Sequence, residues 1–296
     1  MESGAANLLH MLGDRVRSLC EVEKWDEARQ TASMAVSKAR AIHNGSPDNA
    51  GELALSLEVE GDLFRQLGES EKAKSDYLEA LELLANNGDS LEERGRLSAS
   101  LAVLWDQEEN SVEAMRCYQE SIDYFSRLDP PANLDIADLS NNLAFLYEEQ
   151  DNFDRAETLF LNALKICHDE LGSDDEETAA ICNNLGALYQ KAGHHEQAQE
   201  MHRMALAARE ASLGATHLET GQSHANLAAT LADTAQLSGA REHFEKSVAI
   251  YEKNVSESKT DYVTVISNYL QFLKAVQDEK TAAVVEKRAS KMLKKA

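Results

Sequence analysis

Apolar residues recur along the chain with the spacing of amphipathic helices. Ile136, Leu139 and Leu143 follow the helical i, i+3, i+7 pattern, which places their side chains on one face. After a short polar stretch, the same kind of spacing returns over residues 156–164. No segment of the sequence stands out as an alternation of apolar and polar residues, the pattern of a half-buried strand. The pattern therefore predicts an all-α chain made of helical hairpins.

The hairpin is repeated with a period of 42 residues. Residues 142–166 read NLAFLYEEQDNFDRAETLFLNALKI, and residues 184–208 read NLGALYQKAGHHEQAQEMHRMALAA. The same opening returns at Asn226 and, weakened, at Asn268, and steps of 41 to 45 residues extend the pattern toward the N-terminus. We therefore predict a single solenoid over residues 1–296. Its seven approximate repeats are 6–44, 50–88, 91–129, 133–171, 176–213, 218–254 and 260–296, the last a capping unit with a basic tail.

Small residues stand at fixed places in each repeat. Ala144, Gly186 and Ala228 share one position of the first helix, and Ala156 and its equivalents share one position of the second. A side chain no larger than methyl lets two helices approach closely, and large residues then fill the remaining gaps. We expect the aromatic side chains of both helices to form this core. Gly68 is expected in the turn between the helices, as is the glycine at position 193.

The alternation of small and large residues resembles the tetratricopeptide repeat. Two units carry the pattern in order: Leu143, Ala144, Tyr147, Ala156, Phe160 and Ala163, then Leu185, Gly186, Tyr189, Ala198, His202 and Ala205. HEAT repeats have a similar period, but this order of residues favours the tetratricopeptide form. The resemblance implies a right-handed superhelical solenoid of about seven helix-turn-helix units, with the first helices on a concave face.

The 42-residue form of the repeat is similar to that of kinesin light chains. The stretches SNNLAFLY with LGSDDEETA, and CNNLGALYQKAG with LGATHLETG, carry this likeness over residues 133–254. A short, acidic chain of repeats looks most like the bacterial kinesin light chains encoded alongside bacterial tubulins. The resemblance implies a non-catalytic interaction scaffold with a cytoskeletal, tubulin-like partner. A general peptide-binding adaptor is one alternative, and a membrane-tethering module that uses the basic C-terminal segment is another.

The charge of the chain narrows the choice of partners. The sequence holds 52 acidic and 29 basic residues, for a net charge of −23, and this excess disfavours nucleic acid as a partner. The N-terminus shows no secretory signal, and no apolar run is long enough to span a membrane. The four cysteines form no CxxC pair, which favours reduced thiols. We therefore expect a cytoplasmic protein.

A recurring asparagine marks a candidate binding groove. A carboxamide both donates and accepts hydrogen bonds, so a row of them can match the backbone of an extended peptide. In tetratricopeptide proteins that bind peptides, the matching asparagine contacts the ligand backbone, which is what the resemblance implies here. Equally, each asparagine could bond to the neighbouring repeat and stabilise stacking. The candidate groove residues are Asn141, Asn142, Phe145, Asn183, Asn184, Ala187, Lys191, Asn226, Ala229 and Asn268.

The C-terminal segment is a second candidate surface. Its apolar residues, Val284, Val285, Ala289, Met292 and Leu293, have helical spacing. One interpretation is a helix that caps the solenoid, with basic residues that complement the helix dipole. The other is a basic amphipathic patch that makes peripheral contact with an anionic membrane or an acidic protein. The basic residues of this patch are Lys287, Arg288, Lys291, Lys294 and Lys295.

Motifs of catalysis are missing from the sequence. It contains no GxGxxG, GxxxxGK[ST], HExxH or GxSxG motif, and its histidines lack the spacing of a metal site. Carboxylates are abundant because the whole chain is acidic, so their pairing carries no weight for acid–base chemistry. We expect no enzyme activity, no cofactor and no metal ion.

Overall fold

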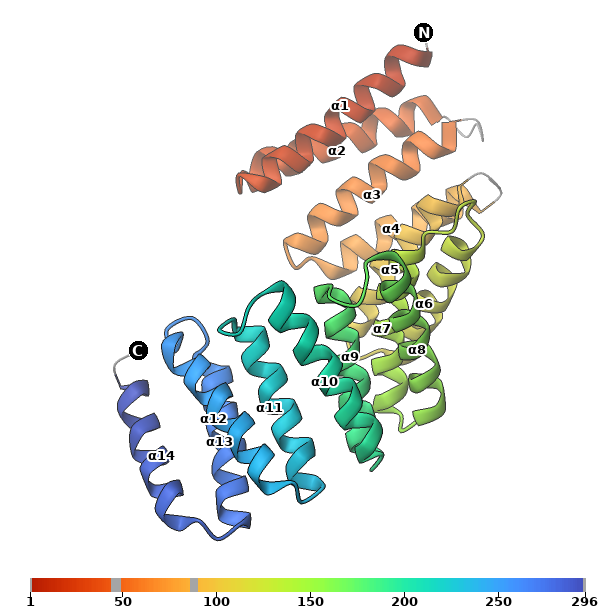
Figure 1. Ribbon diagram of the computed structural model, residues 1–296. Coiled ribbons are helices and arrows are strands. Elements are labelled where there is room, and N and C mark those ends of the chain that lie inside the picture. The colour runs from red at the N-terminus through yellow and green to blue at the C-terminus, as the bar shows by residue number, and fades with distance from the viewer. Residues whose placement is uncertain (1, 44–48, 86–89, 295–296) are drawn as a thin grey trace. The chain divides into compact units, whose positions relative to one another are not determined.

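The described part of the chain is built from helices (Figure 1). A computed structural model describes all residues except 1, 44–48, 86–89 and 295–296, and over those residues it contains fourteen α-helices and no strand. The helices are α1 (Glu2–Glu21), α2 (Trp25–His43), α3 (Ala50–Gln66), α4 (Ser70–Leu84), α5 (Leu91–Gln107), α6 (Ser111–Ser126), α7 (Asn133–Glu149), α8 (Phe153–Glu170), α9 (Glu176–Lys191), α10 (His195–Ser212), α11 (Leu218–Asp233), α12 (Leu237–Lys253), α13 (Lys259–Ala275) and α14 (Glu279–Leu293).

The helices group into two compact units, Met1–Leu146 and Tyr147–Ala296. In the N-terminal unit, α1 packs with α2, α3 with α4 and α5 with α6, and successive pairs are in contact. In the C-terminal unit, α9 packs with α10, α11 with α12 and α13 with α14, while α11 also contacts α9 and α13. This stacking of helix pairs confirms the predicted all-α, helix-turn-helix architecture. The continuity of one solenoid over all 296 residues stays a prediction.

A left-handed residue ends the first helix of each hairpin. In the α9–α10 turn, Gly193 has φ +80°, and the backbone N–H of His194 donates to the carbonyl of Tyr189 at 2.8 Å. A second bond runs from the N–H of Gly193 to the carbonyl of Gln190 at 3.1 Å, which completes a Schellman motif. Glycine was predicted here and at position 68, where φ is +73°. The equivalent residues with a side chain and positive φ are Glu23, Glu109, Asp151, Ala235 and Gln277.

The predicted pairing of small and large residues forms the core. A Cβ on Gly186 would lie 2.6 Å from Cε1 of His202, so the imidazole ring rests directly on the α9 backbone. Gly61 and Tyr77 show the same arrangement at 2.7 Å. Phe244, which corresponds to His202 one repeat later, is buried against Ala228 and its neighbours. The sequence thus located the close helix contacts correctly.

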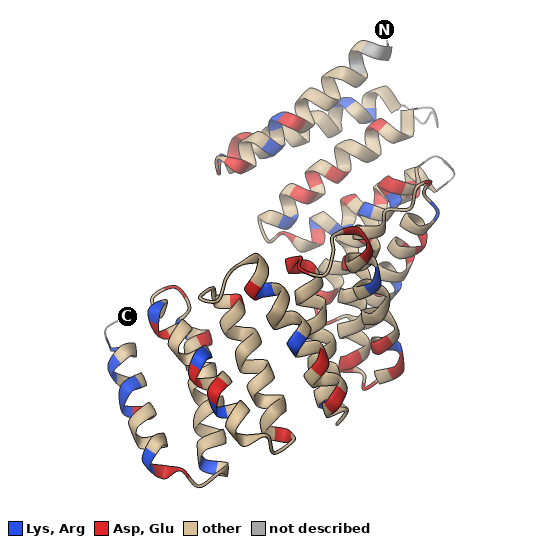
Figure 2. Cartoon of the chain, viewed as in Figure 1, with Lys and Arg blue, Asp and Glu red and all other residues tan. Residues whose placement is uncertain are grey.

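Charge is unevenly distributed over the helices. Figure 2 shows acidic residues on both units, whereas blue segments of Lys and Arg recur along α14. Across the described residues, no helix combines the length and the apolar character that crossing a membrane requires.

Candidate partner-binding groove

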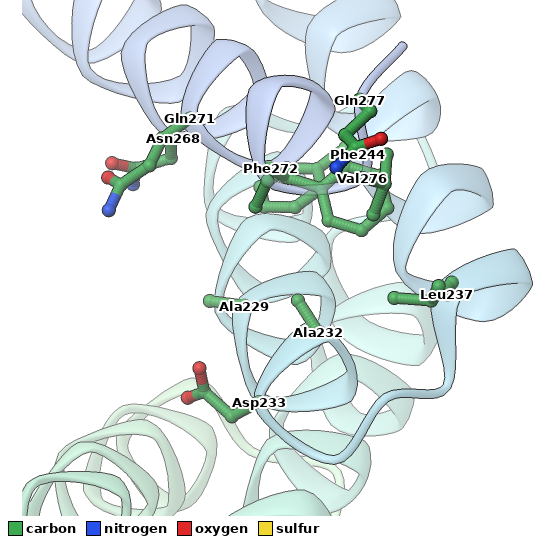
Figure 3. A pocket seen from close by; sticks show the side chains of 11 residues that line it. Ala229, Ala232, Asp233, Leu237, Phe244, Asn268, Gln271, Phe272, Val276 and Gln277 are labelled. Atoms are coloured by element: carbon green, nitrogen blue, oxygen red, sulfur yellow. The ribbon is translucent and has the colours of Figure 1, made fainter.

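An open pocket of about 600 Å³ lies between α11, α12 and α13 of the C-terminal unit (Figure 3). It contains two residues of the predicted groove, Ala229 and Asn268. The first helices of two successive repeats, α11 and α13, supply most of its wall, and the turn after α13 closes one end. Its lining residues are Ala229, Ala232, Asp233, Leu237, Phe244, Asn268, Gln271, Phe272, Ala275, Val276 and Gln277.

The pocket combines an apolar floor with a polar rim. The methyl groups of Ala229 and Ala232 and the side chain of Leu237 face a space that Phe272 bounds on the other side (Figure 3). Asn268 and Gln271 lie together at the rim, on successive turns of α13. A few convergent polar groups around an apolar surface are typical of sites that bind a ligand.

The wall of the pocket is a packed aromatic cluster. The ring of Phe244 lies 5.5 Å from that of Phe272 and 5.3 Å from that of Tyr269, centroid to centroid. Such aromatic pairs add about 0.5–1.5 kcal/mol each beyond their burial. The hydroxyl of Tyr269 donates to Glu245 Oε1 at 3.2 Å, which fixes the end of this ring. The wall is therefore a continuous surface of packed aromatic rings.

Two alanines explain why the pocket is open. One repeat earlier, the residues equivalent to Ala232 and Ala275 are Gln190 and Asp233. There the side-chain N–H of Gln190 donates to Asp233 Oδ2 at 2.6 Å, and the Thr230 hydroxyl lies 3.4 Å from Gln190 Oε1. This bridge fills the space between α9 and α11. Alanine at both positions removes it between α11 and α13.

Asn183 is part of the stack between repeats. It is 6% exposed, its N–H donates to the Ser223 hydroxyl at 3.1 Å, and its Oδ1 lies 3.3 Å from Nδ1 of His202. The amide of Asn226 approaches the same Oδ1 at 3.5 Å. For Asn183, the structure shows the stacking role that the sequence left open beside peptide binding.

The other groove candidates lie at the surface of both units. Asn184 on α9 is partly buried, Ala187 on the same helix is exposed, and Lys191 places Nζ 3.4 Å from Glu148 Oε1. Lys191 lines a smaller pocket of about 110 Å³ with Phe153. On the N-terminal unit, the residues Asn141, Asn142 and Phe145 lie at the surface of α7. Their membership in one row with Asn184 and its equivalents stays a prediction.

Buried histidines occupy both hairpins of this region. His202 is 1% exposed, and burial lowers its pKa to about 4; among the described residues its Nε2 has no hydrogen-bond partner. His224 on α11 places its Nδ1 2.9 Å from Nδ1 of His243 on α12, and burial lowers the pKa of His224 to about 4. Both imidazoles are therefore suited to the neutral form.

Four of the five apolar residues predicted for the C-terminal helix pack within the fold, whereas Val284 is 62% exposed. Ala282 and Ala289 are buried, and Val285, Met292 and Leu293 pack against the core of the C-terminal unit. The arrangement matches the capping interpretation, since these residues are not available for insertion into a membrane. Lys287, Lys291 and Lys294 are exposed, Arg288 pairs with Glu252, and the predicted patch residue Lys295 lies outside the described residues.

Several pocket residues escaped the sequence analysis. Ala232, Asp233, Gln271 and Phe272 line the pocket but were not among the predicted groove residues. The signal was available: at the 42-residue spacing, Ala232 and Ala275 break with Gln190 and Asp233. To recognise the pocket from this break, one must also know that the side chains of Gln190 and Asp233 are hydrogen-bonded to each other.

Comparison with solved structures places the fold among tetratricopeptide proteins. BtubC (BKLC) from P. vanneervenii is 25% identical, with a TM-score of 0.63 over 76% of this chain and 90% of that one. A putative kinesin light chain of nearly identical TPR-like repeats from P. anserina is 19% identical, with a TM-score of 0.58 over 68% and 97%. The apo form of RapI, 12% identical, has a TM-score of 0.72 over 98% and 77%.

Comparison of sequences gives the family. No curated protein matches the chain. Three family models, each described as a tetratricopeptide repeat, match residues 56–87, 135–211 and 220–258, and together they cover half of the 296 residues. The helix pairs, the small-to-large packing and these matches agree, and the chain belongs to the tetratricopeptide repeat family.

Proposed function

We propose that the chain is a non-catalytic cytoplasmic scaffold that binds a partner protein through the exposed first helices of its C-terminal unit. The observation that carries this proposal is the open pocket between α11 and α13, with its apolar floor and amide rim (Figure 3). A repeat array of this family offers an extended surface on which a flexible segment of a partner can lie.

The rim of the pocket supplies the groups that an extended peptide needs. Asn268 and Gln271 each present a carbonyl oxygen and an N–H₂ group, which can pair with the N–H and C=O of a peptide backbone. Asn184 and Asn226 occupy the position of Asn268 on α9 and α11. An extended segment that crosses these three helices would meet one amide per repeat.

The partner we propose is a bacterial tubulin-like filament. The support is the likeness of the repeats to kinesin light chains and the similarity to BtubC (BKLC), at 25% identity over 76% of this chain. A general peptide-binding adaptor uses the same groove and differs only in the partner. The membrane alternative is less favoured, because four of the five apolar residues of α14 are buried or pack against the core.

Co-sedimentation tests both the partner and the surface. The full chain is mixed with assembled bacterial tubulin filaments at low salt and pelleted. We expect the wild type to pellet, the Asn268→Ala/Gln271→Ala variant to lose at least tenfold in affinity, and a matched Lys287→Ala/Lys291→Ala variant to keep wild-type binding.

Each outcome separates one part of the proposal. No pelleting of the wild type above background excludes the filament as partner. Pelleting that the α14 variant loses and the groove variant keeps would move the binding surface from α13 to α14. Far-UV circular dichroism of all three proteins shows whether the substitutions leave the helices intact, as expected for exposed side chains.

A further inference from the structure

We infer that the pocket between α11 and α13 is a specificity subsite that accepts an apolar side chain of a partner peptide followed closely by a lysine or arginine. The inference rests on the proposed function, since it names the kind of peptide that the same groove selects. Three observations support it: the floor of the pocket is made of alanine methyl groups, Asp233 is the one charged residue that lines it in the part of the chain that the structure describes, and the equivalent space one repeat earlier is filled by a hydrogen-bonded bridge.

The floor defines the apolar part of the ligand. Ala229, Ala232 and Ala275 contribute only methyl groups, so the space above them is left for a side chain supplied from outside. The facing wall of Phe244 and Phe272 is apolar and packed, and its rings cannot move in to fill that space without breaking the cluster. A volume of about 600 Å³ lies within the range of pockets that hold small ligands.

The charge defines the neighbouring residue. Asp233 is the one charged side chain among the described residues that line the pocket, and it is exposed at the rim. Its hydrogen-bond partner, the Gln190 amide, is neutral, so this bond of 2.6 Å leaves the charge of the carboxylate uncompensated. Lys191 forms an ion pair with Glu148 at 3.4 Å and Arg241 forms one with Asp278 at 2.9 Å, so both of these cations have carboxylate partners other than Asp233.

The rest of the chain reinforces this preference. A net charge of −23 repels an acidic peptide and attracts a basic one at long range. At short range, a cation beside Asp233 gains a charge-assisted hydrogen bond, whereas a glutamate at the same place meets a like charge. The occupant is therefore a segment with an apolar residue and an adjacent basic residue.

The preceding repeat provides an internal control. Between α9 and α11 the equivalent space holds the Gln190–Asp233 bridge, and no comparable floor of methyl groups is present at those two positions. The preference for an apolar residue beside a basic one therefore belongs to the contact between α11 and α13, where Ala232 and Ala275 leave the space open.

The test is a titration of the full chain, labelled with ¹³C at the alanine methyl groups, with three blocked dipeptides. The probes are acetyl-leucyl-arginine amide, acetyl-leucyl-glutamate amide and acetyl-seryl-arginine amide, each taken to millimolar concentration. We expect the methyl signals of Ala229, Ala232 and Ala275 to shift with the first probe, with an apparent affinity at least tenfold above that for the other two.

Two variants and two matched controls sharpen the test. Asp233→Asn should remove the preference for arginine over glutamate, and Ala232→Gln should abolish the methyl shifts by filling the floor. Asp154→Asn and Ala249→Gln make the same changes at exposed positions of the C-terminal unit outside the pocket, and both should behave as wild type.

Three results would overturn the inference: no shift of these methyl signals with the first probe, equal shifts with arginine and glutamate, or unchanged binding in Ala232→Gln. Filament pelleting is read separately. A wild-type chain that pellets with filaments but ignores the dipeptides keeps the proposed function and loses this subsite, whereas the reverse outcome keeps the subsite and excludes the filament.

Discussion

Two successive contacts between repeats of the C-terminal unit, called steps below, are built from different kinds of side chain. Between α9 and α11 the contact is polar: Asn183 bonds to Ser223, and Gln190 bonds to Asp233. In the next repeat the contact is aromatic: Phe244 of α12 stacks on Tyr269 of α13, with the ring centroids 5.3 Å apart. The polar step fills its outer surface with a bridge, and the aromatic step leaves it open. The difference at the surface follows from the residues at two positions, because Gln190 and Asp233 bridge the first contact, whereas Ala232 and Ala275 leave the second one open.

Buried polar groups fix the geometry of the polar step between α9 and α11. Arg209 is 4% exposed, forms an ion pair with Glu219 at 2.7 Å and donates to the Ser223 hydroxyl at 3.1 Å. Each of these groups must keep its partner, because an unpaired buried polar group costs about 1–3 kcal/mol. The aromatic contact relies instead on the packed rings of Phe244, Tyr269 and Phe272, with the Tyr269 hydroxyl donating to Glu245.

The largest effect is expected from removal of the aromatic core of the second step. Phe244→Ala should lower the free energy of unfolding by about 3–5 kcal/mol, because a buried ring is lost and a cavity remains. Urea denaturation followed by far-UV circular dichroism measures the change. Leu237→Ala, at an exposed position of the same pocket, is the control and should lose less than about 1 kcal/mol. Equal losses would show that Phe244 does not hold α11 and α13 together.

Acid should weaken the packing around His202. The pKa of folded His202 is about 4, below its ordinary value of 6.5, so as pH falls through 6.5 the unfolded chain binds the proton first. The contribution is complete above pH 6.5 and is lost as pH falls toward 4. His202→Phe should therefore lose less stability than wild type between pH 7 and pH 5, by about 2 kcal/mol. Urea denaturation at both pH values measures it, and parallel losses in the two proteins would contradict the prediction.

The close approach of α9 and α10 can be tested with one methyl group. Gly186→Ala places a Cβ 2.6 Å from the His202 ring, and the ring must shift away from Asn183 to accommodate it. We expect a net loss of about 1–2 kcal/mol, since overpacking outweighs the gain in helix propensity. Gly51→Ala, where nothing lies within 4 Å of the new Cβ, should instead gain about 0.5–1 kcal/mol. Thermal melts of both variants measure the change in stability. A more stable Gly186→Ala variant would mean that the His202 ring can move aside without loss of packing.

The smallest change in stability is expected from Gln190→Ala, which should make the contact between α9 and α11 resemble the open contact between α11 and α13. Gln190→Ala removes the bridge to Asp233 at an accessible site, so the free energy of unfolding should change by less than about 1 kcal/mol. It should also open the surface between α9 and α11, so that acetyl-leucyl-arginine amide shifts the methyl signal of Ala187. A silent Ala187 in a well-folded variant would show that the bridge is not what closes this step.

The sequence predicted the parts of the fold that periodicity controls. The pairing of Gly186 with His202 was predictable, because a fixed spacing brings the same two positions together in every repeat. The role of Asn183 was not, because residues 183 and 184 point about 100° apart on a helix and the sequence does not say which one faces the stack. The pocket was hardest to predict, since it depends on two side chains that are missing at Ala232 and Ala275.

The turn that ends α13 has a consequence for evolvability. Gln277 adopts φ +59° there, and its side chain lines the pocket, whereas glycine at position 193 contributes no side chain in the turn after α9. A non-glycine residue in this conformation costs about 1–2 kcal/mol. At this one position, glycine gives the more stable turn, whereas a residue with a side chain can contact a ligand. Each hairpin has its own residue there, so the choice can differ from one repeat to the next.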